Sequence, residues 1–180
     1  GVDVFFVISG FLMTGIVIKS LVRGEFSLFD FYAARARRIV PALLVLCAVL
    51  LGLGWFALLP LDYKTLGTHT LASLGFLSNV KFWDEVGYFD VASHEKWLLH
   101  TWSLSVEWQF YLLLPLLLWA VWRIRPGRAA QAWVIGAGLV LSFVVAVFVT
   151  SSAPSTAFFW LHTRAWEMLA GGAVFLISPG

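Results

Sequence analysis

Five long apolar runs decide what this chain can fold into. A helix needs about twenty predominantly apolar residues to cross the hydrocarbon core of a bilayer, where every backbone N–H and C=O must be paired within the protein. Of the whole sequence, 61% is hydrophobic and only 12% is charged, about half of the charged share of soluble domains. The sequence therefore predicts an all-α integral membrane protein, a polytopic helical bundle with about five spans in one domain of 180 residues. The runs cover residues 4–22, 39–59, 98–122, 132–150 and 158–178.

The positions of Lys and Arg predict how these spans are oriented. Residues 19–38 and 123–128 are basic, whereas the predicted outer loop, residues 60–97, is mixed and mildly acidic. Basic loops tend to stay in the cytoplasm, so we expect Gly1 and the outer loop on the opposite side. Within that loop, residues 71–80 are apolar but too few to cross the membrane, which predicts a re-entrant or interfacial helix.

Charge and cysteine content exclude some functions. The formal net charge of +2 is too small to indicate a nucleic-acid partner, and its basic residues cluster near helix ends. The single cysteine, Cys47, lies in an apolar run, which leaves no disulfide framework and no cysteine metal site. Because the chain begins at Gly1 without Met or a signal-peptide pattern, we expect an internal piece of a longer protein. The sequence predicts contact with membrane lipid but does not indicate an oligomeric state.

A carboxylate, Glu107, interrupts the third apolar run. Ionisable groups at membrane depth are costly and usually mark function. On a helix, three other polar residues fall on the same face at the spacing of i+3 and i+4 neighbours: His100, Ser103 and Tyr111. A polar face on an apolar helix must be turned toward a protein interior or a wet cavity. We therefore expect this polar stripe to line a functional site.

The residues of the stripe also allow other interpretations. His100 and Glu107 lie about 10 Å apart along a helix axis, so they can share a cavity but do not provide the direct contact of a catalytic triad. Alternatively, Glu107 pairs with an Arg of a neighbouring helix to fix the packing, and His100 is an interface residue. Neither interpretation requires a metal, and we expect none.

Arg35 and Arg38 lie in residues 23–38, which we interpret as a polar hinge. Three positions apart, they project from the same side of a helix start, where two guanidinium groups form a fork suited to phosphate oxygens. The alternative is that both are positive-inside anchors for lipid head groups. From the pattern alone we favour the lipid anchor.

Two short motifs combine small residues with charge. Ser9-Gly10 allows the close approach of another helix or a ligand, and Asp3 lies at the outer mouth of the same run. A tight helix crossing with an interfacial acid explains this motif equally well. Farther along, Arg164 and Glu167 can pair at i, i+3, and Gly171-Gly172 allows close packing. For this second motif we favour a self-contained ion pair.

Together these motifs resemble one family, the membrane-bound acyltransferase family 3. They follow the family's order and cover nearly the whole chain. The resemblance implies a multi-pass O-acyltransferase of the bacterial inner membrane, with about ten spans in all, that modifies surface polysaccharide, peptidoglycan or small glycosides. The matching motifs are GVDVFFVISGFL at residues 1–12, FY at 31–32, RARRIVPAL at 35–43, Asn79, YF at 88–89, LHTWSLSVE at 99–107, QFY at 109–111 and RAWE at 164–167.

The resemblance also implies substrates and site residues. The donor is acyl-CoA, usually acetyl-CoA, supplied from the cytoplasm, and the acceptor is a carbohydrate hydroxyl on the periplasmic side. In this family an Arg-x-x-Arg pair is tied to donor handling; it falls here on Arg35 and Arg38 and reverses our preference for a lipid anchor. Glu107 would then orient or charge-stabilise a catalytic imidazole, while Asp3 and His100 shape the outer mouth.

One departure from the family pattern limits this prediction. The family's principal catalytic His belongs to a span that would precede Gly1, and no histidine of this chain replaces it by motif (His69, His94, His100, His162). Trp108 also stands where the family often has a second Glu. We therefore expect this fragment to be inactive alone. Polar residues at membrane depth would equally fit a transporter or flippase, or a non-catalytic membrane sensor of the same fold.

Overall fold

The structure, a computed structural model, describes residues 1–86 and 96–178. These residues form helices and no strand, which confirms the predicted all-α class. Tyr88 and Phe89 of the family motif, together with His94, lie outside the described residues. The helices are α1 (Val2–Arg23), α2 (Leu28–Ala57), α3 (Pro60–Leu74), α4 (Ser78–Glu85), α5 (Thr101–Ile124), α6 (Arg128–Ser152), α7 (Pro154–Phe159) and α8 (Leu161–Ile177).

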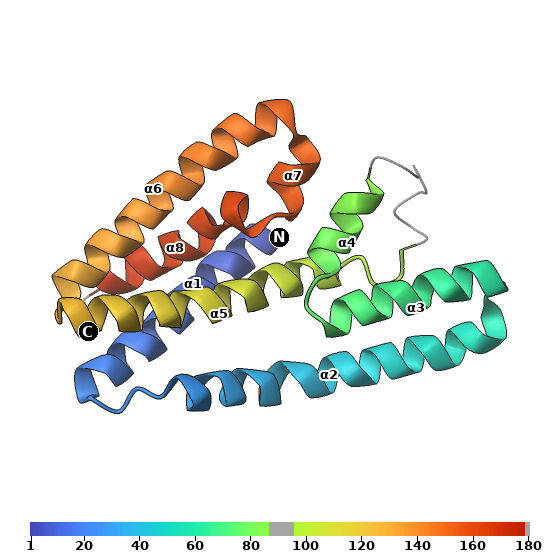
Figure 1. The fold of residues 1–180 in the computed structure, drawn as a ribbon, viewed down its shortest axis with the longest axis horizontal. Coiled ribbons are helices and arrows are strands. Elements are labelled where there is room, and N and C mark those ends of the chain that lie inside the picture. The colour runs from blue at the N-terminus through green and yellow to red at the C-terminus, as the bar shows by residue number, and fades with distance from the viewer. Residues whose placement is uncertain (87–95, 179–180) are drawn as a thin grey trace.

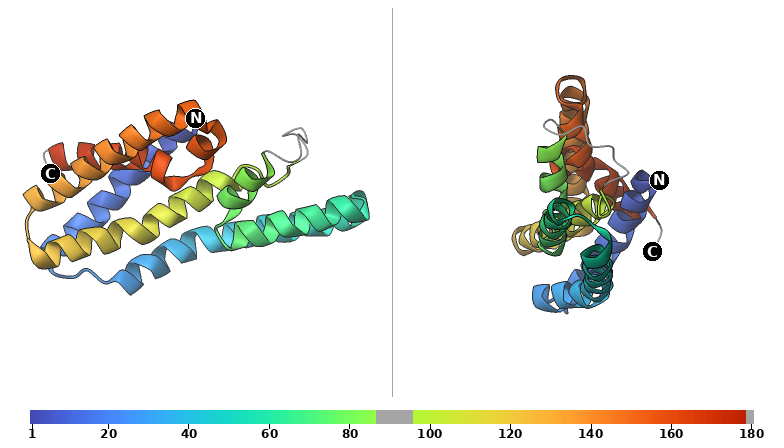
Figure 2. Two further views of the ribbon diagram at one scale, coloured as in Figure 1. Left: turned by 45° about the horizontal axis from the view of Figure 1, so that its top comes forward. Right: turned by 90° about the vertical axis from the view of Figure 1, so that its right-hand side faces the viewer.

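Helix α5 runs through the middle of the bundle, with α2 on one side and α6 on the other (Figures 1 and 2). Helices α1 and α8 pack against each other, and both contact α5. The first half of α2 follows α5, whereas its second half extends beyond the bundle together with α3, which folds back along it (Figure 1). Short helix α4 packs against α5 and also contacts α7. Helices α1, α5 and α8 therefore form the centre of the fold.

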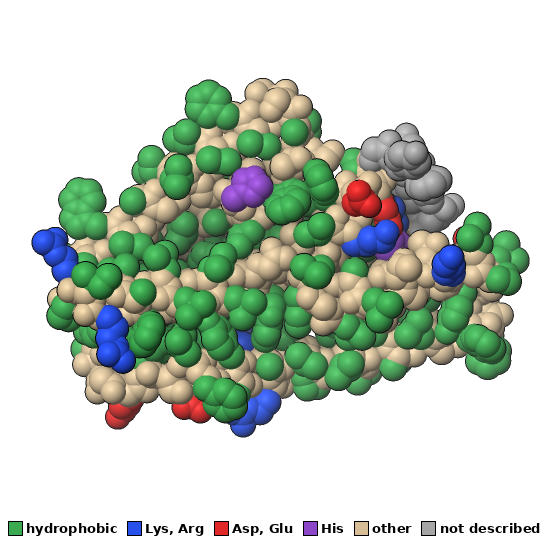
Figure 3. All heavy atoms as spheres, in the orientation of Figure 1, with side chains coloured by type: hydrophobic (Ala, Val, Ile, Leu, Met, Phe, Trp, Pro, Cys, Tyr) green, Lys and Arg blue, Asp and Glu red, His purple; other side chains and the backbone are tan. Residues whose placement is uncertain are grey.

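Four of the described helices are long and apolar enough to cross a membrane: α1, α2, α5 and α6. Helix α8, in the predicted fifth span, is shorter, with 17 residues. Few side chains of α2 and α6 are buried in the bundle, and hydrophobic side chains cover much of the face shown in Figure 3. Such surfaces suit contact with lipid tails. That all five runs cross the membrane, and that they form one domain, stay predictions.

The predicted polar hinge at residues 23–38 is wrong for most of its length, because α2 begins at Leu28. Ser27 caps the helix by accepting a hydrogen bond from the Asp30 backbone N–H at 3.3 Å. This Ser-x-x-Asp pattern is a helix-start signal, and the arginines that follow are good helix formers. Arg35 and Arg38 therefore lie on a continuous helix rather than in a hinge.

The predicted outer loop is also largely helical, and its internal boundary differs from the prediction. Residues 71–80 do not form one helix, because α3 ends at Leu74 and α4 starts at Ser78. Between them Phe76 adopts a left-handed φ of 53°. Its ring stacks on Trp108 at 4.5 Å, and its carbonyl accepts a hydrogen bond from Gln109 at 3.1 Å. Tertiary contacts with α5 therefore interrupt the helix where local hydropathy predicted one continuous helix.

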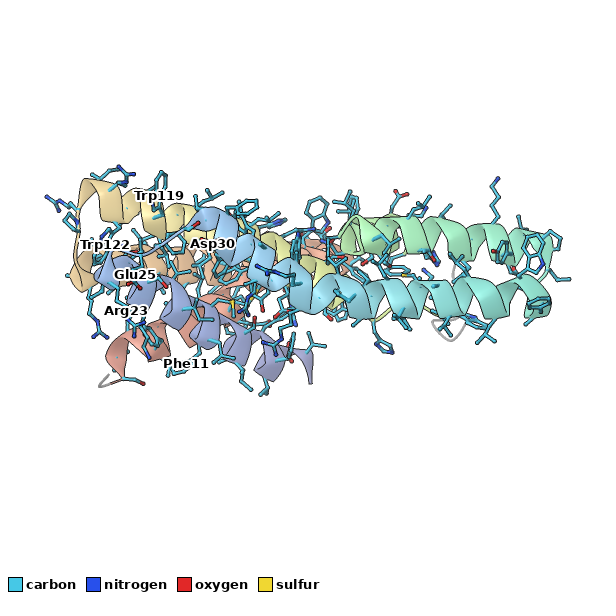
Figure 4. The ribbon with its side chains drawn as sticks, turned by 90° about the horizontal axis from the view of Figure 1, so that it is seen from below. Phe11, Arg23, Glu25, Asp30, Trp119 and Trp122 are labelled. Atoms are coloured by element: carbon cyan, nitrogen blue, oxygen red, sulfur yellow. The ribbon has the colours of Figure 1, made fainter. Side chains whose placement is uncertain are left out.

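The two basic segments lie at the same end of the bundle. In Figure 4, Arg23 and Glu25 at the end of α1 lie near Trp119 and Trp122 at the end of α5. The Arg123 guanidinium lies over the Trp119 ring at 5.0 Å. The two segments that the charge pattern assigned to the cytoplasm are therefore close in space, and the side of the membrane that they face stays a prediction.

Candidate active site

Glu107 lies at the interface of α1 and α5, where it meets two hydroxyl groups. Ser9 Oγ donates a hydrogen bond to Glu107 Oε1 at 2.6 Å, and the Tyr111 hydroxyl donates to the same oxygen. The Ser9 and Tyr111 oxygens are 2.6 Å apart. All three side chains are buried. A buried carboxylate needs such donors, because loss of water is otherwise strongly unfavourable. We refer to these residues as the Ser9–Glu107–Tyr111 cluster.

Close packing of α1 on α8 holds Ser9 against α5. A Cβ atom on Gly10 would overlap the Met168 carbonyl oxygen, and one on Gly171 would overlap the Val7 carbonyl oxygen. The close approach expected at both glycine motifs is thus confirmed, and the two motifs are the two sides of one helix crossing. Helix α1 is held between α8 and α5, and Ser9 faces α5.

Of the four residues in the predicted polar stripe, only Glu107 and Tyr111 belong to the cluster. The His100 side chain is exposed, and Ser103 donates to the His100 carbonyl at 3.1 Å rather than to the cluster. At this end of α5 the buried side chain that faces α1 is Trp102, which meets the Phe6 ring edge-on at 6.3 Å. Because these aromatic rings fill the interface, His100 is left outside it. The place of His100 on the surface still fits the predicted outer mouth.

Hydroxyl groups rather than a cation satisfy Glu107. Among the described residues no Lys, Arg or His lies within 4.0 Å of its carboxylate. The alternative that Glu107 forms a structural ion pair with an Arg of a neighbouring helix is therefore wrong for this part of the chain. Ser9 lies 98 residues away in sequence. The sequence predicted only that a helix or a ligand could approach Ser9-Gly10 closely, and no local pattern marks Ser9 as a partner of Glu107.

Arg35 and Arg38 occupy different environments on α2. The Tyr32 hydroxyl donates to the Leu112 carbonyl at 2.9 Å, which brings this part of α2 alongside α5. One turn later, Arg35 is half-buried, its Nε has no hydrogen-bond partner among the described residues, and its charge is within electrostatic range of the Tyr111 hydroxyl. Arg38 is exposed. The two side chains are therefore not equivalent, and a shared role in a phosphate fork stays a prediction.

Asp3 belongs to an ion-pair network on α1 and α8. The Arg164 guanidinium pairs with Asp3 through one nitrogen and with Glu167 through another, the latter at 3.1 Å. The expected i, i+3 pair of Arg164 and Glu167 is thus confirmed, but it is not self-contained, because Asp3 joins it. The Asp3–Arg164 contact joins residues 161 positions apart, and the sequence motifs gave no sign of it.

A second ion-pair network ties α3 to α4. The buried His69 Nε2 lies 2.9 and 3.0 Å from the two oxygens of Glu85. Lys81 and Lys96 also pair with Glu85, at 3.3 and 3.2 Å. Burial raises the pKa of Glu85, but hydrogen bonds and positive charge from His69 and Lys96 outweigh it and lower the pKa below its usual value. His69 thus has a structural partner and lies away from the Ser9–Glu107–Tyr111 cluster.

Metal binding has no support in the described part of the chain. No group of three or more His, Cys, Asp and Glu side chains there could hold an ion. Cys47, the one cysteine, is buried and free. The expectation that no metal is needed stays a prediction.

Comparisons with known proteins agree on one family. The family model described as an acyltransferase domain, acyltransferase 3, matches residues 1–178. The peptidoglycan O-acetyltransferase OatA of Listeria monocytogenes is 34% identical over 184 residues, and the O-acetyltransferase OatA of Staphylococcus aureus is 32% identical over 186 residues. Each alignment covers 99% of this chain, but only 29% and 30% of those relatives. An uncharacterised protein of Haemophilus influenzae is 41% identical over 116 residues, which is 64% of this chain and 47% of that protein.

The chain thus spans less than a third of the length of the two O-acetyltransferases. No solved structure matches it. The residues matched by the family model include every member of the Ser9–Glu107–Tyr111 cluster and of the Arg164 network.

Proposed function

Because the chain belongs to the acyltransferase 3 family, we propose that it takes part in transferring an acyl group to a hydroxyl of a cell-surface carbohydrate. The donor is acyl-CoA, in the first instance acetyl-CoA, and the site of action is the bacterial inner membrane. The names of the two O-acetyltransferase relatives support this substrate class. In the reaction, the acceptor oxygen bonds to the thioester carbonyl carbon, the carbon–sulfur bond breaks, and the acceptor proton is passed on as the CoA thiol leaves.

The observation that carries this proposal is the buried Ser9–Glu107–Tyr111 cluster. A carboxylate bonded to O–H donors can orient a neighbouring group and accept or stabilise a proton, which acyl transfer to a hydroxyl requires. We assign Glu107 this supporting role. The base that it serves is the family's His, which is expected in a span before Gly1.

The other predicted site residues receive separate roles. Arg38, exposed on α2, suits recognition of donor phosphates. Arg35 would share this role from a half-buried position on the same helix. His100 and Asp3, both at the end of the bundle opposite the basic segments, would line the approach of the acceptor.

Replacing Glu107 by Gln in the full-length protein tests the proposal. We expect acyl transfer from acetyl-CoA to fall by about 100-fold, the lower end of the range for a positioned acid or base. Glu25→Gln is the matched control, because Glu25 is exposed near the end of α1 and takes no part in the cluster. Wild-type transfer by the Glu107 variant at normal expression would refute the role of Glu107. A wild-type protein that moves substrate without using acyl-CoA would instead support the transporter alternative.

A further inference from the structure

The Arg164 network joins four helices at one point. Arg164 pairs with Asp3 of α1 and with Glu167 of its own helix. Its guanidinium also lies over three aromatic rings, at 5.6 Å from Phe6, 5.9 Å from Trp102 and 5.9 Å from Phe158, which belong to α1, α5 and α7. A cation held both by carboxylates and by ring faces is fixed in position.

This network lies directly next to the Ser9–Glu107–Tyr111 cluster. Phe6 precedes Ser9 by one helical turn on α1, and its ring meets Trp102 in the first turn of α5. The Arg164 guanidinium contacts both rings. Since α1 begins at Val2 and the basic segments lie at its other end, the network closes the outer end of the interface in which Glu107 is buried.

Some polar atoms of the network form no hydrogen bond with the described residues. Glu167 is 2% exposed, yet its Oε2 has no hydrogen-bond partner, and Arg164 Nε has none. The Asp3 side chain is 66% exposed, so its carboxylate can accept further hydrogen bonds from outside the bundle. Beside them the Phe158 ring is 46% exposed. The Arg164 guanidinium thus contacts both an exposed carboxylate and an exposed ring, which an ion pair made only for packing would not need.

We propose that Asp3 and Arg164 bind hydroxyl groups of a neutral sugar unit of the acceptor, and that Glu167 positions Arg164; this subsite rests on the proposed acyl transfer. A carboxylate accepts and a guanidinium donates hydrogen bonds, which together match the two capacities of a hydroxyl group. The exposed ring of Phe158 offers an apolar surface to the C–H face of a sugar. The exposed carboxylate of Asp3 beside the guanidinium disfavours a phosphate or carboxylate ligand by repulsion between like charges.

Steady-state kinetics of the full-length protein with acetyl-CoA test the subsite. The acceptor probes are a neutral N-acetylglucosamine oligosaccharide and isolated peptidoglycan glycan strands. For Asp3→Asn we expect at least a tenfold rise in the acceptor KM, with the KM for acetyl-CoA unchanged, and we expect Asp3→Glu to recover most of the loss. Glu167→Gln should also raise the acceptor KM more than it lowers kcat. The matched control is Asp62→Asn, an exposed carboxylate on α3, which should leave both KM values unchanged.

The possible results separate the subsite from the proposed function. If the wild type transfers acetyl groups and Asp3→Asn keeps the wild-type acceptor KM, the subsite is refuted while the acyltransferase proposal stands. If Asp3→Asn raises both KM values together, or changes the elution of the detergent-solubilised protein, the ion pair is structural and the subsite is again refuted. A wild type that neither transfers acetyl groups to these probes nor hydrolyses acetyl-CoA would count against the proposed function and the subsite together.

Discussion

At the scale of single residues, the partners of Glu107 decide how it can act. Glu107 is bonded to the hydroxyls of Ser9 and Tyr111 rather than to an arginine, so two O–H donors from two helices hold its carboxylate in place. The Arg35 charge lies near enough to influence Tyr111 without pairing with Glu107 in the described structure. The cluster therefore combines a carboxylate held by hydroxyl groups with a nearby positive charge.

The environments of the two α2 arginines lead to different expected effects. Replacing Arg35 by Gln should lower kcat for acyl transfer by about tenfold, equivalent to ~1.4 kcal/mol, because its charge acts beside the buried cluster. Arg38→Gln should mainly raise the KM for acetyl-CoA, since Arg38 is exposed. Steady-state kinetics over a range of acetyl-CoA concentrations separate the two effects. Exposed Arg37→Gln serves as the control on the same helix turn, and equal effects of all three changes would contradict this division.

The burial of Glu107 and its proximity to Tyr111 could be predicted from the sequence, but its contact with Ser9 could not. Hydropathy around the residue and helical spacing are local properties, and they correctly placed Glu107 and Tyr111 on one buried face. The contact between Ser9 and Glu107 depends on how α1 crosses α5, and nothing near Glu107 in the sequence indicates that crossing. The same limit applies to Asp3 and Arg164, which meet only because α1 packs on α8.

At the scale of elements, the crossing of α1 and α8 gives the site its geometry. Helices in lipid gain little from apolar contact alone, so close backbone approach through small residues is a main source of their association. Gly10 and Gly171 face the opposing backbone at this crossing, and Gly172 lies against Thr14. Any side chain at these positions would push α1 away from α8 and change where Ser9 meets Glu107.

Replacing Gly10 by Ala should therefore destabilise the protein by about 3 kcal/mol, the upper end of the usual cost of overpacking. The added methyl group would overlap the Met168 carbonyl, which belongs to the backbone and cannot rotate away. Gly136→Ala on α6 is the control: a Cβ there meets nothing within 4 Å, and alanine favours helix by up to ~1 kcal/mol. Unfolding of the purified protein in mixed detergent micelles measures both. A neutral Gly10 variant would show that the crossing is looser than described.

The α3–α4 segment shows where local hydropathy fails to predict an element. The apolar residues 71–80 were expected to form one helix, but the chain turns at Phe76 because its ring and carbonyl are both held by α5. The Glu85 network then fixes α4 in its new direction by linking it to His69 of α3 and to Lys96. Contacts between elements, which no local window contains, decide this boundary.

The lowered pKa of Glu85 predicts an acid-sensitive link between α3 and α4. A carboxylate whose folded-state pKa is depressed contributes stability above its unfolded pKa, about 4.3 for glutamate, and loses it as the pH falls through the lower folded value. We expect amide hydrogen exchange in α4 to speed up as the pH falls below about 4, after correction for the intrinsic rate. Glu85→Gln should abolish this pH dependence, and Asp62→Asn should not. An unchanged pH dependence in the Glu85 variant would assign it to another group.

At the scale of the whole molecule, apolar faces and charged ends are separated. The exposed side chains of residues 41–57 on α2 and 132–149 on α6 are hydrophobic, whereas the basic segments lie together at one end of the bundle (Figure 4). The donor and acceptor of the proposed reaction would then approach the buried cluster from opposite ends. The sequence predicted this orientation from charge, and the structure adds that both basic segments share one end.

Cysteine labelling of the full-length protein tests the orientation directly. The single native cysteine, Cys47, is buried, so Cys47→Ala gives a background without thiols from the described chain. In this background, a membrane-impermeant maleimide applied to intact spheroplasts should label Lys64→Cys, because this residue is exposed near the start of α3, just after the end of α2. Glu25→Cys and Arg125→Cys, both exposed in the basic segments, should react only after permeabilisation. The opposite labelling pattern would show that the basic segments face the outside, which contradicts the proposed approach of acyl-CoA from the cytoplasm. Labelling of only one of the two basic segments in intact spheroplasts would contradict their shared end in the fold.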